Sequence, residues 1–129
     1  MQEVHVFLIT SSNAPGKIKR AWYEYMLVYN TKVLKEHREA KDITGQLLIL
    51  SCAREALARM NRSASLVIHT DNPYFVDNYG KLGEWEKNGW KRAGGKEIRH
   101  AELWKELYKL CSMHEIHFKN DNMEIYKDT

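Results

Sequence analysis

The hydrophobic pattern first changes from period two to helical spacing near residue 40, and this change limits the fold more than any other feature. Before it, from Ala21 to Tyr29, large aromatic and β-branched side chains alternate at period two, which is typical of a strand. After it, apolar residues such as Leu47, Leu50 and Leu57 recur at helical spacing. Strands followed by alternating helices and strands predict an α/β fold with a mixed sheet.

The pattern also places the individual elements. Strands are expected at Val4–Ile9, Ala21–Tyr29, Lys32–Glu39, Ser65–Thr70 and His114–Phe118, and helices at Ile43–Met60, Tyr74–Tyr79 and Ala101–Ser112. Asp42 or Thr44 is available to cap the first helix, and Asn72 before Pro73 marks the start of the second. The first three strands form a meander and the last two follow crossovers through helices. We therefore expect a mixed five-stranded sheet, an antiparallel meander plus two parallel strands, flanked by helices, with residues 80–99 as a loop.

Length and composition agree with a single domain over residues 1–129. The chain is 43% hydrophobic and 29% charged, an ordinary globular profile. Its apolar stretches are far shorter than the ~20 residues that span a bilayer, and it lacks the pattern of an export signal. We therefore expect a cytoplasmic protein without membrane contact. Cys52 and Cys111 have no metal-ligand spacing and are expected to be buried free thiols.

Two segments carry a resemblance to a known family. One is Leu66 to Val76, LVIHTDNPYFV, and the other, EWEKNGWKRAGGKEIRHAELWKEL, begins at Glu84. They resemble type 1 ribonuclease H, in which a strand ends in Thr-Asp-Ser, a helix follows, and a basic Trp-containing protrusion leads into a helix marked Asp-Leu-Trp. The resemblance is closest from Gln46 to Phe118. It implies the ribonuclease H-like fold and cleavage of the RNA strand of RNA/DNA hybrids with two Mg²⁺ ions.

The resemblance also implies a set of four metal-binding carboxylates, of which one is retained. The family's second Asp is Asp71, whereas its first Asp and its Glu fall at Thr10 and Gln46, which offer only neutral oxygens. Two Mg²⁺ ions roughly 4 Å apart need several negative charges around them. The fourth carboxylate lies on a C-terminal helix that the pattern after Phe118 does not show. We therefore expect a degenerate, C-terminally shortened member, a pseudoenzyme that needs no cofactor.

An alternative stays open in which other acids complete the metal site. The candidates are Asp42, Asp77, Asp121, Glu124 and Asp128, with Asp128 best suited to the missing C-terminal position. The protein would then be an active ribonuclease H that uses Asp71 and Mg²⁺ or Mn²⁺. The family's minor-groove contacts fall at Asp42-Ile43 and at Pro73, and neither Ile43 nor Pro73 has a side-chain donor for RNA.

The segment that corresponds to the protrusion is basic and aromatic. Its cations are Lys87, Lys91, Arg92, Lys96 and Arg99, against the single acid Glu97, and Trp85 and Trp90 lie among them. Cations beside aromatic side chains are suited to a nucleic-acid backbone, although the formal charge of the whole chain is only +3. We predict binding of an RNA/DNA hybrid or duplex here. The alternative is that the two Trp side chains only pack and the cations are simply solvated.

A third hypothesis treats the fold as a scaffold for protein interaction. A sheet edge, or a surface left open by the absent last helix, would then meet a partner or a second copy in a homodimer. The remaining candidates indicate structure rather than chemistry. His114 and His117 are predicted to point to opposite faces of a strand, and His69 and Trp104 are expected in the core.

Overall fold

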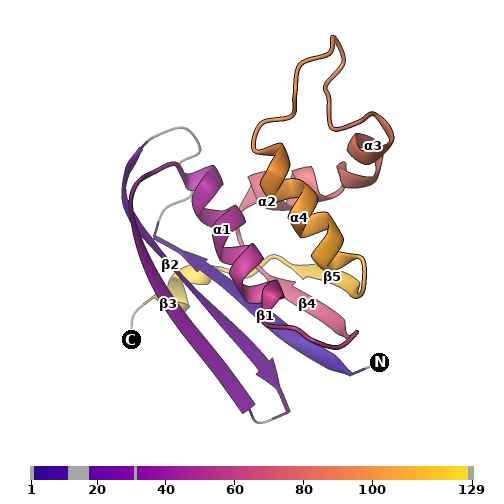
Figure 1. The fold of residues 1–129 in the computed structure, drawn as a ribbon. Helices are drawn as coiled ribbons and strands as arrows, with labels where there is room; N and C mark the ends of the chain where they lie inside the picture. Colours follow the sequence, from indigo (N-terminus) through magenta and orange to yellow (C-terminus); the bar gives the residue numbers. More distant parts are fainter. Residues whose placement is uncertain (1, 12–17, 31, 128–129) are drawn as a thin grey trace.

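A computed structural model describes residues 2–11, 18–30 and 32–127, and within them five strands form one mixed sheet (Figure 1). The strands are β1 (Glu3–Thr10), β2 (Lys19–Tyr29), β3 (Lys32–Ile43), β4 (Ser65–His69) and β5 (Glu115–Lys119), in the order β3-β2-β1-β4-β5. β2 is antiparallel to both β1 and β3, whereas β4 is parallel to β1 and to β5. The predicted meander with two added parallel strands is confirmed.

Four helices cover one face of this sheet. They are α1 (Gly45–Ala58), α2 (Pro73–Tyr79), α3 (Leu82–Lys87) and α4 (Ala101–Cys111). α1 packs on β1 and β2 and touches α4 alongside it (Figure 1). A 3₁₀ helix, η1 (Met123–Tyr126), lies against the opposite face. There the ring of Tyr126 packs on that of Phe7 in β1, with the ring centroids 5.1 Å apart. None of the helices in the described ranges is long and apolar enough to cross a membrane.

The alternation along β2 determines which side chains reach the core. Tyr23, Tyr25 and Leu27 are buried beneath the helices, as period two requires. Trp104 of α4 is fully buried, and its Nε1–H donates to the hydroxyl of Tyr74 at 3.2 Å. The expectation that Trp104 belongs to the core is confirmed.

Both cysteines are buried free thiols, as expected. Burial raises the pKa of Cys111 to about 11 and raises that of Cys52 further. Both thiols therefore stay protonated near neutral pH and pack as small apolar groups.

The predicted start of the first long helix was wrong because a neighbouring element decides it. β3 continues to Ile43, where it pairs with Lys19 of β2, so the first long helix cannot begin there. Thr44 is its N-cap: the backbone is extended and the side-chain oxygen accepts the N–H of Leu47 at 3.3 Å. The helix ends at Ala58 instead of Met60.

The stretch 80–99 is also more ordered than the predicted loop. It begins with α3, whose Leu82 is buried, and continues as a short hairpin. In this hairpin the backbones of Lys91 and Glu97 form an isolated antiparallel β-bridge. The N–H of Arg92 donates to the carbonyl of Lys96 at 2.6 Å. We call residues 88–99 the basic loop. It projects from the end of the molecule that carries α3 (Figure 1).

Candidate metal site and nucleic-acid interface

The three positions that the resemblance assigns to metal binding lie at one end of the sheet. Thr10 is the last residue of β1, and Asp71 follows the end of the parallel neighbour β4. Gln46 is the second residue of α1, which starts where β3 ends, and β3 runs in the same direction as β1. All three residues therefore lie toward the carboxyl ends of β1 and β4.

The donor groups at this end are mostly neutral. Thr10 supplies a hydroxyl and is buried, Gln46 supplies an amide, and Asp71 supplies one carboxylate. The Oδ2 atom of Asp71 accepts the N–H of Met123 at 3.0 Å, so this carboxylate also holds the C-terminal segment. One carboxylate does not balance the charge of two divalent cations, so these three residues alone do not fit a two-metal site.

The substitute acids in the described ranges either have other partners or are exposed to solvent. Asp121 pairs with the Nδ1 atom of His69, and Glu124 accepts a hydrogen bond from Lys127 at 2.6 Å. The side chains of Asp42 and Asp77 are exposed to solvent. Asp128, the candidate for the missing C-terminal carboxylate, lies outside the described residues.

His69 is a satisfied buried histidine. Its Nε2 atom lies 2.8 Å from Nδ1 of His5 on the adjacent strand, and Phe7 stacks on its ring with centroids 4.1 Å apart. Together with the Asp121 pair, these contacts attach the segment after β5 to the sheet face opposite the helices. His69 is therefore a structural residue of the core, as the sequence predicts.

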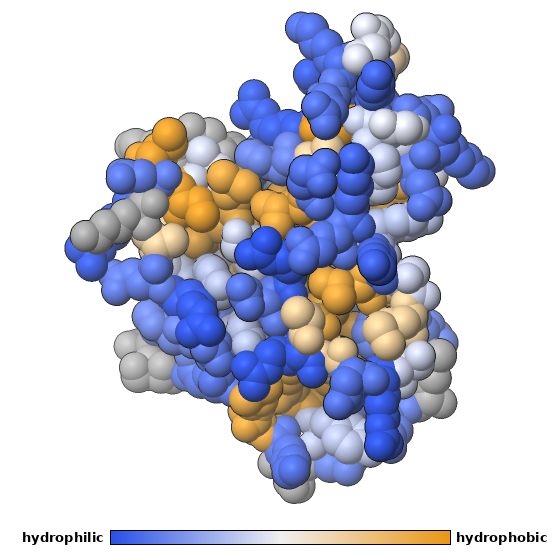
Figure 2. Space-filling view, in the orientation of Figure 1, coloured by the Kyte–Doolittle hydropathy of each residue, from blue (hydrophilic) through white to orange (hydrophobic). Residues whose placement is uncertain are grey.

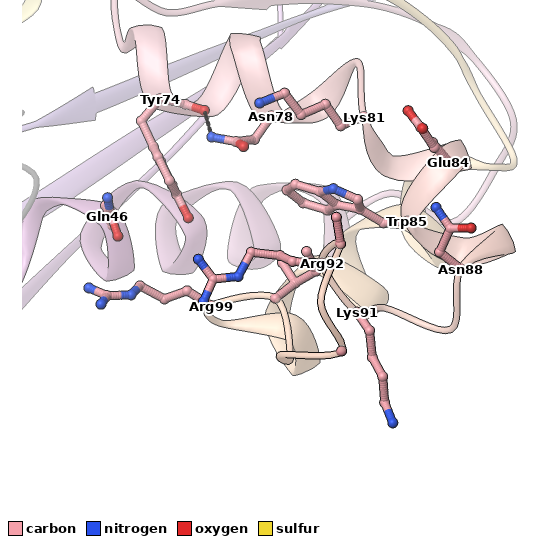
Figure 3. A pocket seen from close by; sticks show the side chains of 13 residues that line it. Gln46, Tyr74, Asn78, Lys81, Glu84, Trp85, Asn88, Lys91, Arg92 and Arg99 are labelled. Carbon is pink, nitrogen blue, oxygen red and sulfur yellow. Dashed lines mark hydrogen bonds between the residues drawn. The ribbon is translucent and has the colours of Figure 1, made fainter.

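A cavity of about 910 Å³ opens between α1, α2, α3 and the basic loop (Figure 3). Four cations line it, Lys81, Lys91, Arg92 and Arg99, against one carboxylate, Glu84. Gln46 lies at one end of the cavity and the amides of Asn78 and Asn88 lie along it. The cavity therefore joins one of the metal-site positions to a surface rich in positive charge and neutral hydrogen-bonding groups.

Tyr74 lines this cavity beside Gln46 (Figure 3). Burial raises the pKa of Tyr74, and the hydrogen bond with Trp104 and the nearby Arg99 oppose that shift. The hydroxyl therefore stays protonated at neutral pH. It accepts the Trp104 hydrogen bond while keeping its own proton available for an acceptor in the cavity.

The basic residues predicted for nucleic-acid contact are exposed. These are Lys87, Lys91, Arg92, Lys96 and Arg99, and none forms an ion pair with a carboxylate in the described ranges. Lys91, Arg92 and Arg99 line the cavity, while Lys87 and Lys96 lie outside its lining. The structure thus brings three of the five predicted cations to one cavity.

The two Trp side chains near the basic loop take part in packing. Trp85 lies edge-on to Trp104 at 6.0 Å and to Trp90 at 6.4 Å, and Trp90 meets Tyr108 of α4 at 6.1 Å. Trp85 also lines the cavity. The indoles therefore hold the start of the basic loop against α4, and Trp85 can serve both packing and binding.

Sequence reasoning missed the contribution of α2 and α3 to this cavity. Tyr74, Asn78 and Lys81 reach it because α2 and α3 turn around its rim. The i,i+3 spacing of Leu82 and Trp85 is the signal that could have revealed α3 and placed Lys81 at its N-terminus.

Comparison with known proteins agrees with this geometry. The ribonuclease H family model matches residues 2–120, and the chain belongs to that family. Ribonuclease H of Francisella tularensis subsp. novicida is 32% identical over 92 residues, which cover 70% of this chain and 60% of that protein. The matched part therefore spans less than two thirds of this relative's length.

Solved structures show the same fold. LC9-RNase H1, described as a type 1 RNase H with the type 2 active-site motif, superposes with a TM-score of 0.72 at 19% identity, over 98% of this chain and 68% of that chain. LC11-RNase H1, solved in complex with an RNA/DNA hybrid, superposes with a TM-score of 0.66 at 10% identity, over 96% and 88% of the two chains.

Proposed function

We propose that this ribonuclease H-like domain binds an RNA/DNA hybrid or duplex through the cavity beside the basic loop and does not cleave it. The observation that carries the proposal is the cluster of exposed cations at Lys91, Arg92 and Arg99, without carboxylate partners in the described ranges, on a cavity that reaches Gln46. Unpaired cations that converge on one concave surface are suited to consecutive phosphates.

The neutral groups of the cavity support the same ligand. The hydroxyl of Tyr74 and the amides of Asn78 and Asn88 can donate to phosphate oxygens or to sugar hydroxyls. The bound hybrid in the LC11-RNase H1 structure is consistent with this ligand class.

The absence of cleavage is inferred from the charge of the donor set. Asp71 supplies a carboxylate, but the positions of Thr10 and Gln46 supply neutral oxygens. Ribonuclease H chemistry needs Mg²⁺ or Mn²⁺ held by several carboxylates, which these three residues do not provide.

Active ribonuclease H is the second candidate, favoured by family membership and by the place of Asp71 after β4. A labelled RNA/DNA hybrid incubated with the protein and Mg²⁺ or Mn²⁺ separates the two. We expect binding with the RNA strand intact. Cleavage that is abolished by Asp71→Asn would establish the second candidate instead.

The binding half of the proposal is tested by the Lys91→Ala/Arg92→Ala double variant. We expect it to weaken hybrid binding and to reduce the slope of log affinity against log salt by about 2, because each of the two cations neutralises about one phosphate. Lys109→Ala/Lys119→Ala removes the same charge from exposed positions outside the cavity and is the control. Equal slopes for the two double variants would exclude the cavity as the binding surface.

A further inference from the structure

A second cavity, of about 540 Å³, opens at the other end of α1. It lies between the start of β1, the ends of β2 and β3 near their connection, and the segment that follows α1. We call it the distal groove. Figure 2 shows apolar surface at this end of the molecule, above the connection of β2 and β3. The site described above uses the opposite end of α1.

The distal groove has an apolar floor. Val4 and Leu27 are buried at its base, and Met60 lies partly buried beside them. Leu34 also lines it and is partly buried, and its pairing with Leu27 of β2 places it on the same face of the sheet. Nothing in the proposed nucleic-acid function uses these side chains.

The rim of the distal groove carries positive charge. Lys32, Arg59 and Arg62 line it, and no acidic side chain in the described ranges does. The charge of Arg59 is already balanced within the chain. Its guanidinium pairs with the Glu36 carboxylate at 3.4 Å, and the residue lies at the C-terminus of α1, the negative end of the helix dipole. Lys32 and Arg62 form no ion pair with a described carboxylate, so their charge is free to meet a ligand.

We infer that the distal groove docks an acidic peptide segment of a partner protein. An apolar side chain of the peptide would lie on Leu34 and Met60, and flanking carboxylates would pair with Lys32 and Arg62. The volume lies within the range of ligand pockets, about 300–1,000 Å³. An apolar anchor with charges at its margin is the usual composition of such contacts. Phosphates alone would leave the apolar floor unused, which argues against a nucleic-acid backbone here.

The test uses a fluorescein-labelled peptide, Asp-Glu-Leu-Phe-Asp-Glu, and the full chain. We expect saturable binding with a dissociation constant below about 100 μM at low salt, about −5.5 kcal/mol or tighter. A peptide with Ser in place of Leu and Phe, and another with Asn and Gln in place of the acids, should each bind at least tenfold more weakly. Arg62→Glu and Lys32→Glu, both at exposed positions, should weaken binding of the first peptide at least tenfold, and Lys109→Glu should not.

Several results would overturn the inference. One is the absence of saturable binding, and another is binding that survives both Arg62→Glu and Lys32→Glu. Equal loss of labelled RNA/DNA hybrid binding in Arg62→Glu would instead assign the groove to nucleic acid. A dimer in gel filtration that Arg62→Glu converts to a monomer would assign it to a second copy. The Lys91→Ala/Arg92→Ala variant should bind the peptide normally, so this test is separate from that of the proposed function.

Discussion

Asp71 links the candidate metal site to the stability of the C-terminal segment. Its Oδ2 atom accepts the N–H of Met123, and the Met123 side chain is almost fully buried. A variant that removes the carboxylate therefore changes folding as well as chemistry.

The two roles of Asp71 can be separated by two substitutions. Asp71→Asn keeps an oxygen acceptor for Met123, whereas Asp71→Ala leaves that N–H without it. We expect Asp71→Ala to lower the free energy of unfolding by about 1–3 kcal/mol and Asp71→Asn to lower it by less. Urea unfolding followed by circular dichroism measures both. If the Ala variant were as stable as the parent chain, the hydrogen bond to Met123 would contribute nothing to the free energy of unfolding.

His114 makes stability depend on pH. Burial lowers the pKa of His114 below its ordinary value of 6.5, and its neutral Nδ1 accepts the N–H of Ala64 at 3.2 Å. The unfolded chain therefore takes up this proton at a higher pH than the folded chain. Stability from this group is complete above pH 6.5 and declines as the pH falls from there through the lower pKa of the folded state.

We expect His114→Gln, which keeps an acceptor but cannot titrate, to flatten the pH dependence. Unfolding free energies at pH 7.5, 6.5 and 5.5 should fall less steeply for the variant than for the parent chain. His100, whose pKa is lowered by burial and by Arg99, contributes with the same sign in both proteins and does not obscure the difference. Parallel curves would show that His114 is not the responsible group.

Individual residues of the candidate site were predictable only where a local pattern or a family resemblance marks them. Asp71 follows a short apolar strand, and Thr10 ends another, so both could be placed from the sequence. The pairing of His69 with Asp121 could not, because it joins residues 52 positions apart and depends on where the segment after β5 turns.

At the scale of elements, the segment after β5 is held to the sheet by a short 3₁₀ helix. η1 has four residues, yet it inserts Met123 and sets Tyr126 against Phe7. We expect Met123→Ala to cost about 2–5 kcal/mol of unfolding free energy, because it opens a cavity in a filled core. Ile125→Ala is the control: Ile125 is in the same element, is 69% exposed, and should change stability by less than about 0.5 kcal/mol. Equal effects would mean that η1 is not docked through Met123.

The elements were predictable to the extent that their own side chains define them. α1 carries a broad apolar stripe and was placed within two residues at each end, whereas α3 has six residues and was missed. β3 was predicted to stop at Glu39. Pairing with β2 extends it to Ile43, and that partner is not visible in the local pattern.

At the scale of the whole molecule, the two proposed binding surfaces lie at opposite ends of α1. Gln46 lines the cavity beside the basic loop, and Arg59 to Arg62 line the distal groove. A helix of 14 residues at 1.5 Å per residue separates them by about 20 Å, which exceeds the Debye length of ~8 Å at physiological salt. The charges at one surface are therefore screened from a ligand at the other. Although the net charge of the chain is only +3, the molecule has two separate cationic regions.

This separation predicts that the two ligands bind independently. At about 0.15 M salt, saturating acidic peptide should change the affinity for a labelled RNA/DNA hybrid by less than about twofold, because screening and distance leave little coupling energy. Lys91→Ala/Arg92→Ala should weaken only the binding of the hybrid, and Arg62→Glu should weaken only the binding of the peptide. For each ligand, the combined variant should change the binding free energy by the sum of the changes in the two separate variants. Fluorescence anisotropy with each labelled ligand measures all four proteins. Competition between the ligands would show that one surface serves both, whereas independence would allow the domain to hold a nucleic acid and a protein partner at once.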